Sequence, residues 1–176
     1  MVITILSGSN HEGSTTGKLC RYMQRCFEAE GHQVLLFDIA ERPLPVFSEK
    51  GSYDEDDNVG TLRSWVAEGQ AIVLATPEYH GSLSGALKNS IDFLWPQFDG
   101  KPVLSASVAG GPVGVSSLLH LQSIVRNVHA INSPEWISLG GPDRAFTDAG
   151  EPENPKMRER IQRACNYLLK LAESLA

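Results

Sequence analysis

The sequence predicts an α/β protein with a parallel sheet of five strands in the order 2-1-3-4-5 and helices on both faces. Strand-like and helix-like patterns alternate along all 176 residues. Several strand candidates are continuous apolar runs, which is typical of strands covered on both faces. A chain of this length suits one domain with a sizeable core, and this order is the economical arrangement of five alternating units. We therefore expect residues 1–176 to form a single three-layer domain.

Five segments have the composition of buried strands, being rich in Val, Ile and Leu. In chain order they are Val2–Leu6, Gln33–Phe37, Ala71–Thr76, Val103–Val108 and a segment within Ala130–Leu139. The apolar run at the N-terminus is too short for a signal peptide and has no basic leader. We interpret it as the first strand of the sheet.

Between these segments, apolar residues recur at the spacing of amphipathic helices. One stripe begins at Leu19 and continues to Phe27, and Gly31 follows as a stop signal. Three further stripes cover residues 83–94, 118–128 and 157–175, and a shorter helix is expected over Thr61–Glu68. The stretch Arg42–Asn58 contains prolines and an acidic run without the ligand spacing of a calcium loop, so we expect a solvated surface loop.

Charge and cysteine content argue against several classes of function. The formal net charge of −6 argues against a general nucleic-acid-binding surface. No apolar stretch approaches the length of a membrane span. The three cysteines are widely spaced and form neither a disulfide framework nor a metal-ligand pair. The expected compartment is the cytoplasm.

The loop after the first strand has the composition of a phosphate-binding loop. Ser7–Thr16 holds five hydroxyl residues and two glycines and leads directly into a helix. Its backbone amides, its hydroxyl groups and the helix N-terminus all favour an anion. Ser14 stands where a Walker loop needs lysine, and no G-x-G-x-x-G fingerprint is present. The alternative is an ordinary Ser/Thr-rich helix cap, although one cap needs fewer hydroxyl groups.

A second unusual loop, Pro77–Ser82, follows the third strand candidate. In parallel α/β sheets ligands bind at the carboxyl ends of strands where the strand order reverses, here between strands one and three. Pro77 stiffens the exit from the strand, and Gly81 permits a positive φ. Tyr79 could pack on a ligand ring or simply cover the core. The two loops together indicate a binding site at this edge.

Residues 77–92 read P-E-Y-H-G-S-L-S-G-A-L-K-N-S-I-D. They resemble the P-E-Y-N-x-S/G-x-x-G-x-L-K-N-A-I-D signature of the NADPH-dependent FMN reductase family of flavodoxin-like proteins. Residues 8–14 resemble the first loop of that family, G-S-x-R-x-x-S, with His11 in place of the arginine. His80 replaces the common asparagine of the signature. Further similar stretches lie at 38–45, 100–103, 109–114 and 145–150, so the similarity covers nearly the whole chain.

The resemblance implies a flavodoxin-like fold and an FMN-dependent oxidoreductase. Such an enzyme passes hydride from NADPH or NADH to bound FMN and then to free flavin, a quinone, an azo compound or a metal oxyanion. The first loop would bind the FMN phosphate, and the second loop and a glycine-rich loop after strand four would surround the ring. The residues assigned to the cofactor in this way are Ser9, His11, Ser14, Thr15, Thr16, Pro77, Glu78, Tyr79, His80, Gly81, Ser82, Gly110 and Gly111.

The resemblance also implies a homodimer or homotetramer, formed through the helix after the second loop and its neighbour. No catalytic side chain is expected, because a flavin supplies its own redox chemistry. Two other functions stay open: a flavodoxin-type FMN electron carrier without NAD(P)H turnover, and a non-redox phosphate- or nucleotide-binding module. The first loop lacks the T-x-T-G-x-T spacing of flavodoxins, which favours the reductase.

Overall fold

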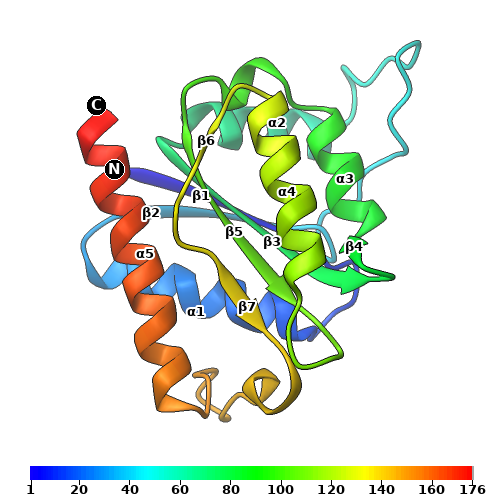
Figure 1. Ribbon diagram of the computed structural model, residues 1–176. Helices are drawn as coiled ribbons and strands as arrows, with labels where there is room; N and C mark the ends of the chain where they lie inside the picture. The colour runs from blue at the N-terminus through cyan, green and yellow to red at the C-terminus, as the bar shows by residue number, and fades with distance from the viewer. Residues whose placement is uncertain (176) are drawn as a thin grey trace.

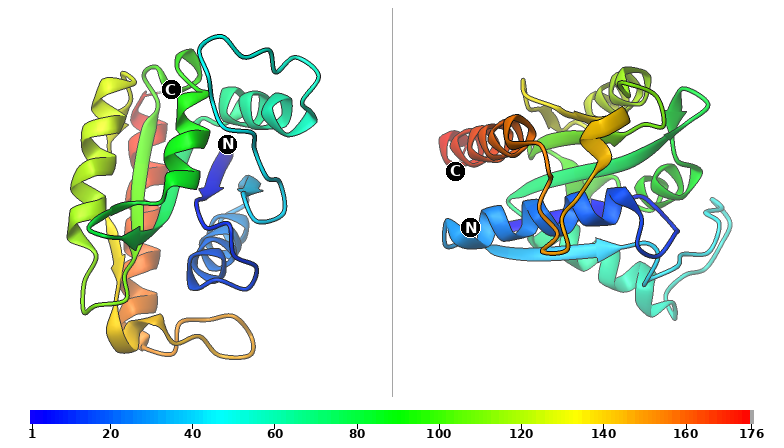
Figure 2. Two further views of the ribbon diagram at one scale, coloured as in Figure 1. Left: turned by 90° about the vertical axis from the view of Figure 1, so that its right-hand side faces the viewer. Right: turned by 90° about the horizontal axis from the view of Figure 1, so that it is seen from below.

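The computed structural model, which describes residues 1–175, places one twisted sheet between two layers of helices (Figure 1). Helices α1 (Thr15–Ala29) and α5 (Pro155–Leu175) cover one face of the sheet. Helices α2 (Asp57–Glu68), α3 (Gly85–Asp92) and α4 (Val115–Asn127) cover the other. The views in Figure 2 show the same three layers, so the predicted architecture is confirmed.

Four long parallel strands form the centre of the sheet in the order β2-β1-β3-β5. They are β1 (Val2–Ser7), β2 (Gln33–Asp38), β3 (Ala71–Tyr79) and β5 (Pro102–Val108). Two short strands, β6 (Ile131–Asn132) and β7 (Ile137–Leu139), both pair in parallel with β5. They share the fifth position, so the predicted order 2-1-3-4-5 holds for the parallel part of the sheet.

The sheet has seven strands where five were predicted, for two local reasons. The expected fifth strand is interrupted near Pro134, which has no N–H to donate to a neighbouring strand. An additional strand, β4 (Ser82–Leu83), pairs antiparallel with the end of β3, which runs beyond Thr76 to Tyr79. The helix expected from residue 83 therefore starts only at Gly85.

The acidic run, residues 54–57, lies only in part in the predicted surface loop, because Asp56 and Asp57 begin α2. The Asp56 carboxylate accepts hydrogen bonds from the backbone N–H groups of Asn58 and Val59, at 3.0 and 2.9 Å. This is an N-terminal helix cap, and Asp57 adds negative charge to the first turn, where the helix dipole favours it. The helix consequently begins four residues before the predicted Thr61, and residues 42–56 remain outside helices and strands.

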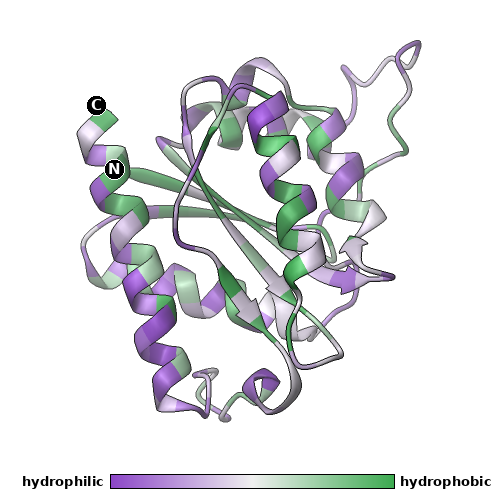
Figure 3. Ribbon diagram, in the orientation of Figure 1, coloured by the Kyte–Doolittle hydropathy of each residue, from purple (hydrophilic) through white to green (hydrophobic). Residues whose placement is uncertain are grey.

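Two apolar cores lie on the two faces of the sheet, because successive strand side chains point in opposite directions. On β1, Ile3 and Ile5 face α1 and α5, whereas Leu6 faces the other layer. Figure 3 shows hydrophobic residues concentrated in the strands. Cys20 and Cys26 fill the core under α1, as predicted. Among the described helices, none is both long enough and apolar enough to cross a bilayer.

Candidate functional site

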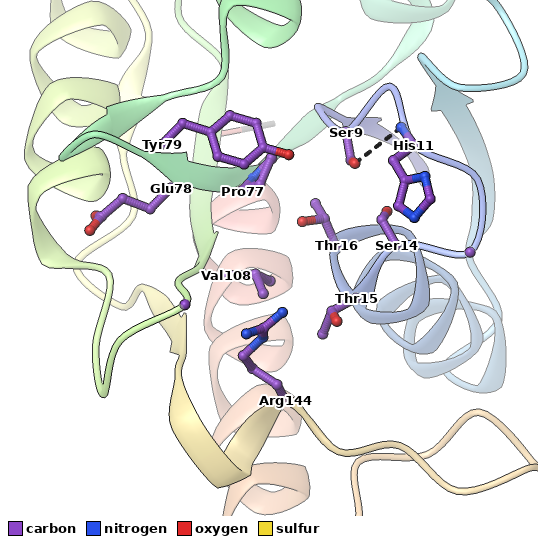
Figure 4. A pocket seen from close by; sticks show the side chains of 12 residues that line it. Ser9, His11, Ser14, Thr15, Thr16, Pro77, Glu78, Tyr79, Val108 and Arg144 are labelled. Carbon is purple, nitrogen blue, oxygen red and sulfur yellow. Dashed lines mark hydrogen bonds between the residues drawn. The ribbon is translucent and has the colours of Figure 1, made fainter.

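A cavity of about 440 Å³ opens at the carboxyl edge of the sheet, beside the loops after β1, β3 and β5 (Figure 4). Its size is typical of small-molecule and cofactor sites. Most of the predicted site residues line it, while His80, Gly81, Ser82 and Gly111 lie outside the lining. The lining residues are Ser9, His11, Gly13, Ser14, Thr15, Thr16, Pro77, Glu78, Tyr79, Val108, Gly110 and Arg144.

One end of the cavity is formed by the first loop and the start of α1. Ser14 is the N-cap of this helix, since its Oγ accepts a hydrogen bond from the Gly17 N–H at 3.0 Å. Thr15 and Thr16 follow as the first helical residues, and their N–H groups find no acceptor within residues 1–175. Ser9, only 2 % exposed, accepts a hydrogen bond from the His11 N–H. The donors that remain free at this end suit a phosphate group.

Close packing at Gly8 holds the first loop against β3. The Gly8 N–H donates to the Ala75 carbonyl at 2.8 Å. A Cβ atom on Gly8 would lie 2.7 Å from both the Ala75 oxygen and the Leu87 Cβ, so no larger residue fits. The Ser84 hydroxyl donates to the Gly8 carbonyl at 2.6 Å and also caps α3. The first loop is thus fixed relative to β3 and to the start of α3.

The second loop is a two-residue turn between β3 and β4. Tyr79 pairs with Ser82 across the turn, and the two central residues, His80 and Gly81, have φ angles of 51° and 75°. The Tyr79 ring, 52 % exposed, lies beside the cavity (Figure 4). Ser82 Oγ is hydrogen-bonded to Nδ1 of His120 at 2.9 Å. The predicted cofactor contacts of His80, Gly81 and Ser82 therefore stay predictions, whereas Tyr79 is placed to touch a ligand.

Glu78 connects two walls of the cavity. Figure 4 shows its carboxylate directed away from the first loop. The Glu78 Oε2 atom accepts hydrogen bonds from the N–H and the hydroxyl group of Ser117, at 3.0 and 2.9 Å. Gly114, the N-cap residue of α4, has no side chain to perform this task. Glu78 therefore caps α4 and ties the end of β3 to the loop after β5.

Arg144 is a lining residue that the sequence did not reveal. It ends the short helix η2 (Gly141–Arg144), which follows β7, and it lines the cavity from the side of β7 (Figure 4). The Gly141 N–H donates to the Gly111 carbonyl at 2.9 Å, which fixes η2 beside the loop after β5. Val108 and Gly13 were also missed. The only available signal for Arg144 was the family-like stretch at 145–150, which begins one residue later.

The cysteines take no part in this site. Burial raises the pKa of the Cys20 thiol to about 12. Burial likewise raises the pKa values of Cys26 and Cys165. Such thiols are protonated near neutral pH and are poor nucleophiles. The side chains around the cavity therefore offer binding and orientation rather than thiol redox chemistry.

Comparison with known proteins gives a consistent result along most of the chain. The model of the family described as NADPH-dependent FMN reductase matches residues 1–142. An NADPH azoreductase of Bacillus sp. (strain OY1-2) is 30 % identical over 170 residues, covering 96 % of this chain and 93 % of the relative. An FMN-dependent NADPH-azoreductase of Staphylococcus saprophyticus is 36 % identical over 151 residues, covering 83 % of this chain and 80 % of the relative.

Solved structures support the fold. FerB, a flavoenzyme NAD(P)H:(acceptor) oxidoreductase from Paracoccus denitrificans, superposes with a TM-score of 0.82 at 20 % identity, covering 98 % of this chain and 97 % of that chain. A flavodoxin from the domain Archaea superposes with a TM-score of 0.63 at 13 % identity, covering 99 % of each chain. The arrangement of sheet and helices is therefore flavodoxin-like, as predicted.

Proposed function

The chain belongs to the NADPH-dependent FMN reductase family, and from this membership we propose how it holds its cofactor and what it reduces. It is an FMN-dependent NAD(P)H oxidoreductase. FMN, when bound, supplies the redox chemistry by taking hydride from NAD(P)H and passing electrons to an acceptor. The residues of this chain bind the cofactor, orient it and leave room for donor and acceptor.

The phosphate of FMN is assigned to the first loop. The N–H groups of Thr15 and Thr16 point out of the α1 N-terminus, where the helix dipole adds positive potential. The hydroxyl groups of Ser9, Thr15 and Thr16 supply further donors around the same end of the cavity. His11 contributes a ring nitrogen at its rim. This set of donors fits a phosphate better than it fits a neutral or a cationic group.

The flavin ring is assigned to the other end, where the lining is more apolar. Pro77 and Tyr79 lie on the side of β3, while Val108 and Gly110 lie on the side of β5 (Figure 4). Gly110 has open space where a side chain would stand, so a planar ring system has access to the backbone there. FMN has a phosphate at one end and a planar ring system at the other. The observation that carries the proposed site is that one cavity has a donor-rich end and an apolar end to match them.

A matched pair of variants at Ser14 tests the position of the phosphate. Aspartate and asparagine both serve well as N-caps, so Ser14→Asp and Ser14→Asn should keep α1 folded. Only aspartate brings a negative charge to the phosphate. We expect Ser14→Asp to weaken FMN binding roughly tenfold or more relative to Ser14→Asn, from charge repulsion at short range. Quenching of flavin fluorescence on titration with the FMN-free protein measures both affinities.

Riboflavin, which lacks the phosphate, is the internal control for this pair. Both variants should bind riboflavin about equally, and the wild-type protein should prefer FMN to riboflavin. Equal wild-type affinities for the two flavins would overturn the assignment of the phosphate to this loop. So would an equal loss of both flavins in Ser14→Asp relative to Ser14→Asn, since the added charge would then not act through the phosphate.

Azo compounds are the acceptors we propose. The support is that the Bacillus and Staphylococcus relatives are azoreductases by name. The measurement is anaerobic decolorisation of an azo dye by the FMN-loaded protein and NADPH, with a soluble quinone in a parallel reaction. Bleaching of the dye at a rate set by enzyme concentration supports the proposal. NADPH oxidation with the quinone alone would reject azo compounds as acceptors and leave the oxidoreductase activity standing.

A homodimer formed through α3 and α4 is part of the proposal. Trp95, just after α3, is 69 % exposed, and it lines a hollow of about 370 Å³ that reaches Ile124 of α4 and Val128, just after α4. Leu119 of α4 is also exposed. An exposed aromatic residue beside further apolar surface is typical of an interface.

The cytoplasm is the proposed compartment, a choice supported by three buried free cysteines.

A further inference from the structure

We propose that Arg144 supplies the permanent positive charge that holds the FMN phosphate. The inference rests on the proposed FMN site and adds to it a residue from a distant part of the chain. Arg144 lines the same cavity as Ser14, Thr15 and Thr16. Figure 4 shows its guanidinium group directed into the cavity, with Val108 and Thr15, the first residue of α1, as its nearest labelled neighbours in this view.

The first loop itself lacks a permanent cation. Residues 7–16 contain neither lysine nor arginine, and His11 is the only basic residue among them. A phosphate monoester carries close to two negative charges near neutral pH. Backbone amides and hydroxyl groups satisfy hydrogen bonds without neutralising that charge, so a cation in the same cavity adds what the loop does not provide.

The other cations near α1 are already engaged. Arg21 forms ion pairs with Asp38 and Glu41, at 3.2 and 2.6 Å. Arg25 donates to the Gly150 carbonyl at 2.7 Å. Lys18 is exposed and is not among the lining residues. Within the described part of the chain, Arg144 is the only arginine or lysine that lines the cavity.

Arg144 is free for a ligand in the structure as described. Within residues 1–175 its guanidinium group makes no hydrogen bond or ion pair. The neighbouring acid, Asp143, forms no ion pair with it within the described residues, and its carboxylate instead accepts a hydrogen bond from the Asn154 side chain at 2.7 Å. A guanidinium group without a carboxylate partner beside a donor-rich loop fits a phosphate, which it binds through two parallel hydrogen bonds.

The backbone below Arg144 is held in place. The Gly141 N–H bonds to the loop after β5 at Gly111, and Gly140 packs so closely on Pro112 that a Cβ atom would collide with it. After η2, the Glu153 N–H donates to the Ala145 carbonyl at 3.0 Å. The arginine is thereby anchored on both sides, which lowers the cost of ordering its side chain around an anion.

The test compares flavin affinities of Arg144→Gln, Arg144→Lys and wild-type protein in their FMN-free forms. Charge-assisted hydrogen bonds to a phosphate predict a loss of FMN affinity of about tenfold or more in Arg144→Gln, with a smaller loss in Arg144→Lys. Riboflavin affinity should stay unchanged in both. The control for net charge is Lys170→Gln, which removes one exposed positive charge on α5, outside the cavity lining. The FMN affinity of Arg144→Gln should also depend less on salt than that of the wild-type protein.

A second substitution provides a rescue. Placing arginine in the first loop by His11→Arg should restore much of the FMN affinity of Arg144→Gln, because either position then supplies the cation. The same His11→Arg change in the wild-type protein should increase FMN affinity by a smaller factor, because Arg144 already supplies a cation there.

The possible outcomes separate this inference from the function on which it rests. If wild-type protein prefers FMN to riboflavin and Arg144→Gln keeps that preference, the role of Arg144 is refuted while the phosphate site stands. The role is equally refuted if the variant binds FMN normally and only the KM for NADPH rises, since the arginine then serves the nucleotide. If wild-type protein shows no preference for FMN, the proposed phosphate site fails first.

Discussion

At the scale of single residues, His80 occupies a backbone conformation that most side chains avoid. Its φ of 51° and that of Gly81, 75°, make the turn between β3 and β4 one in which both central residues are left-handed. Such turns fit the twist of a hairpin and favour Asn-Gly. This explains the asparagine in the family signature by backbone geometry, independently of any contact with a flavin.

Replacing His80 by asparagine should stabilise the protein. Asparagine tolerates the left-handed region better than histidine, so we expect a gain of about 0.5–1 kcal/mol in the free energy of unfolding. Urea titration of the FMN-free protein measures it, with His80→Val as the opposite control because β-branched residues are strained at positive φ. Flavin titration of the same variant tests the predicted cofactor contact of His80, which does not line the cavity. An unchanged or lower stability would show that the imidazole has a compensating contact.

The residues of the site differ in how readily a sequence reveals them. One short run of sequence contains Ser9, Ser14, Thr15 and Thr16, and this run alone predicts that they bind an anion. Arg144 belongs to no such cluster. It reaches the cavity only because β7 pairs with β5 and the chain then turns back over the loop after β5. A contact made by tertiary packing leaves no local pattern.

At the scale of elements, the cap that Glu78 provides couples a strand end to a helix start. We expect Glu78→Ala to lower the free energy of unfolding by about 1–2 kcal/mol, the usual cost of a lost N-cap. Glu78→Gln keeps an acceptor oxygen for Ser117 and should lose less. FMN affinity should fall in the same order, because both connected segments border the cavity.

Denaturant unfolding and flavin titration on the same samples check this coupling. Glu49→Ala, at an exposed position in the loop before α2, is the control for removal of an acid. If Glu78→Ala had the same urea midpoint of unfolding as the wild-type protein and bound FMN normally, the cap would have no role in shaping the site.

The elements were predictable where hydrophobic patterns are long, and poorly predictable where single polar contacts decide. The central strands and all five helices follow from apolar periodicity. Strand β4 was not predicted, because its turn has the sequence His-Gly rather than the Asn-Gly that is typical of hairpins. The start of α2 depends on the cap at Asp56, which was interpreted only as part of an acidic run. The interruption at Pro134 could have been expected from the missing N–H.

At the scale of the whole molecule, the exposed surface beside α3 and α4 carries the prediction of a dimer. Trp95→Asp should convert the particle from twice the 19.2 kDa chain mass to a monomer, because a charge would be buried in an apolar interface. Light scattering at micromolar concentration measures the mass. Tyr167→Asp, an exposed aromatic on the opposite helical layer, is the matched control and should leave the dimer intact. A wild-type protein that scatters as a monomer with full activity would refute the interface.

Both ends of the described chain lie together, far from the cavity (Figure 1). The Val2 N–H bonds to Gln70, and Gln70 shares a shallow hollow with Ala172 and Leu175. The cavity lies instead at the carboxyl edge of the sheet. Either terminus therefore offers a point of attachment that leaves the entrance clear. The enzyme can therefore be tethered to a bead or an electrode without covering the cavity. It can also be joined in one polypeptide to a dehydrogenase that regenerates NADPH.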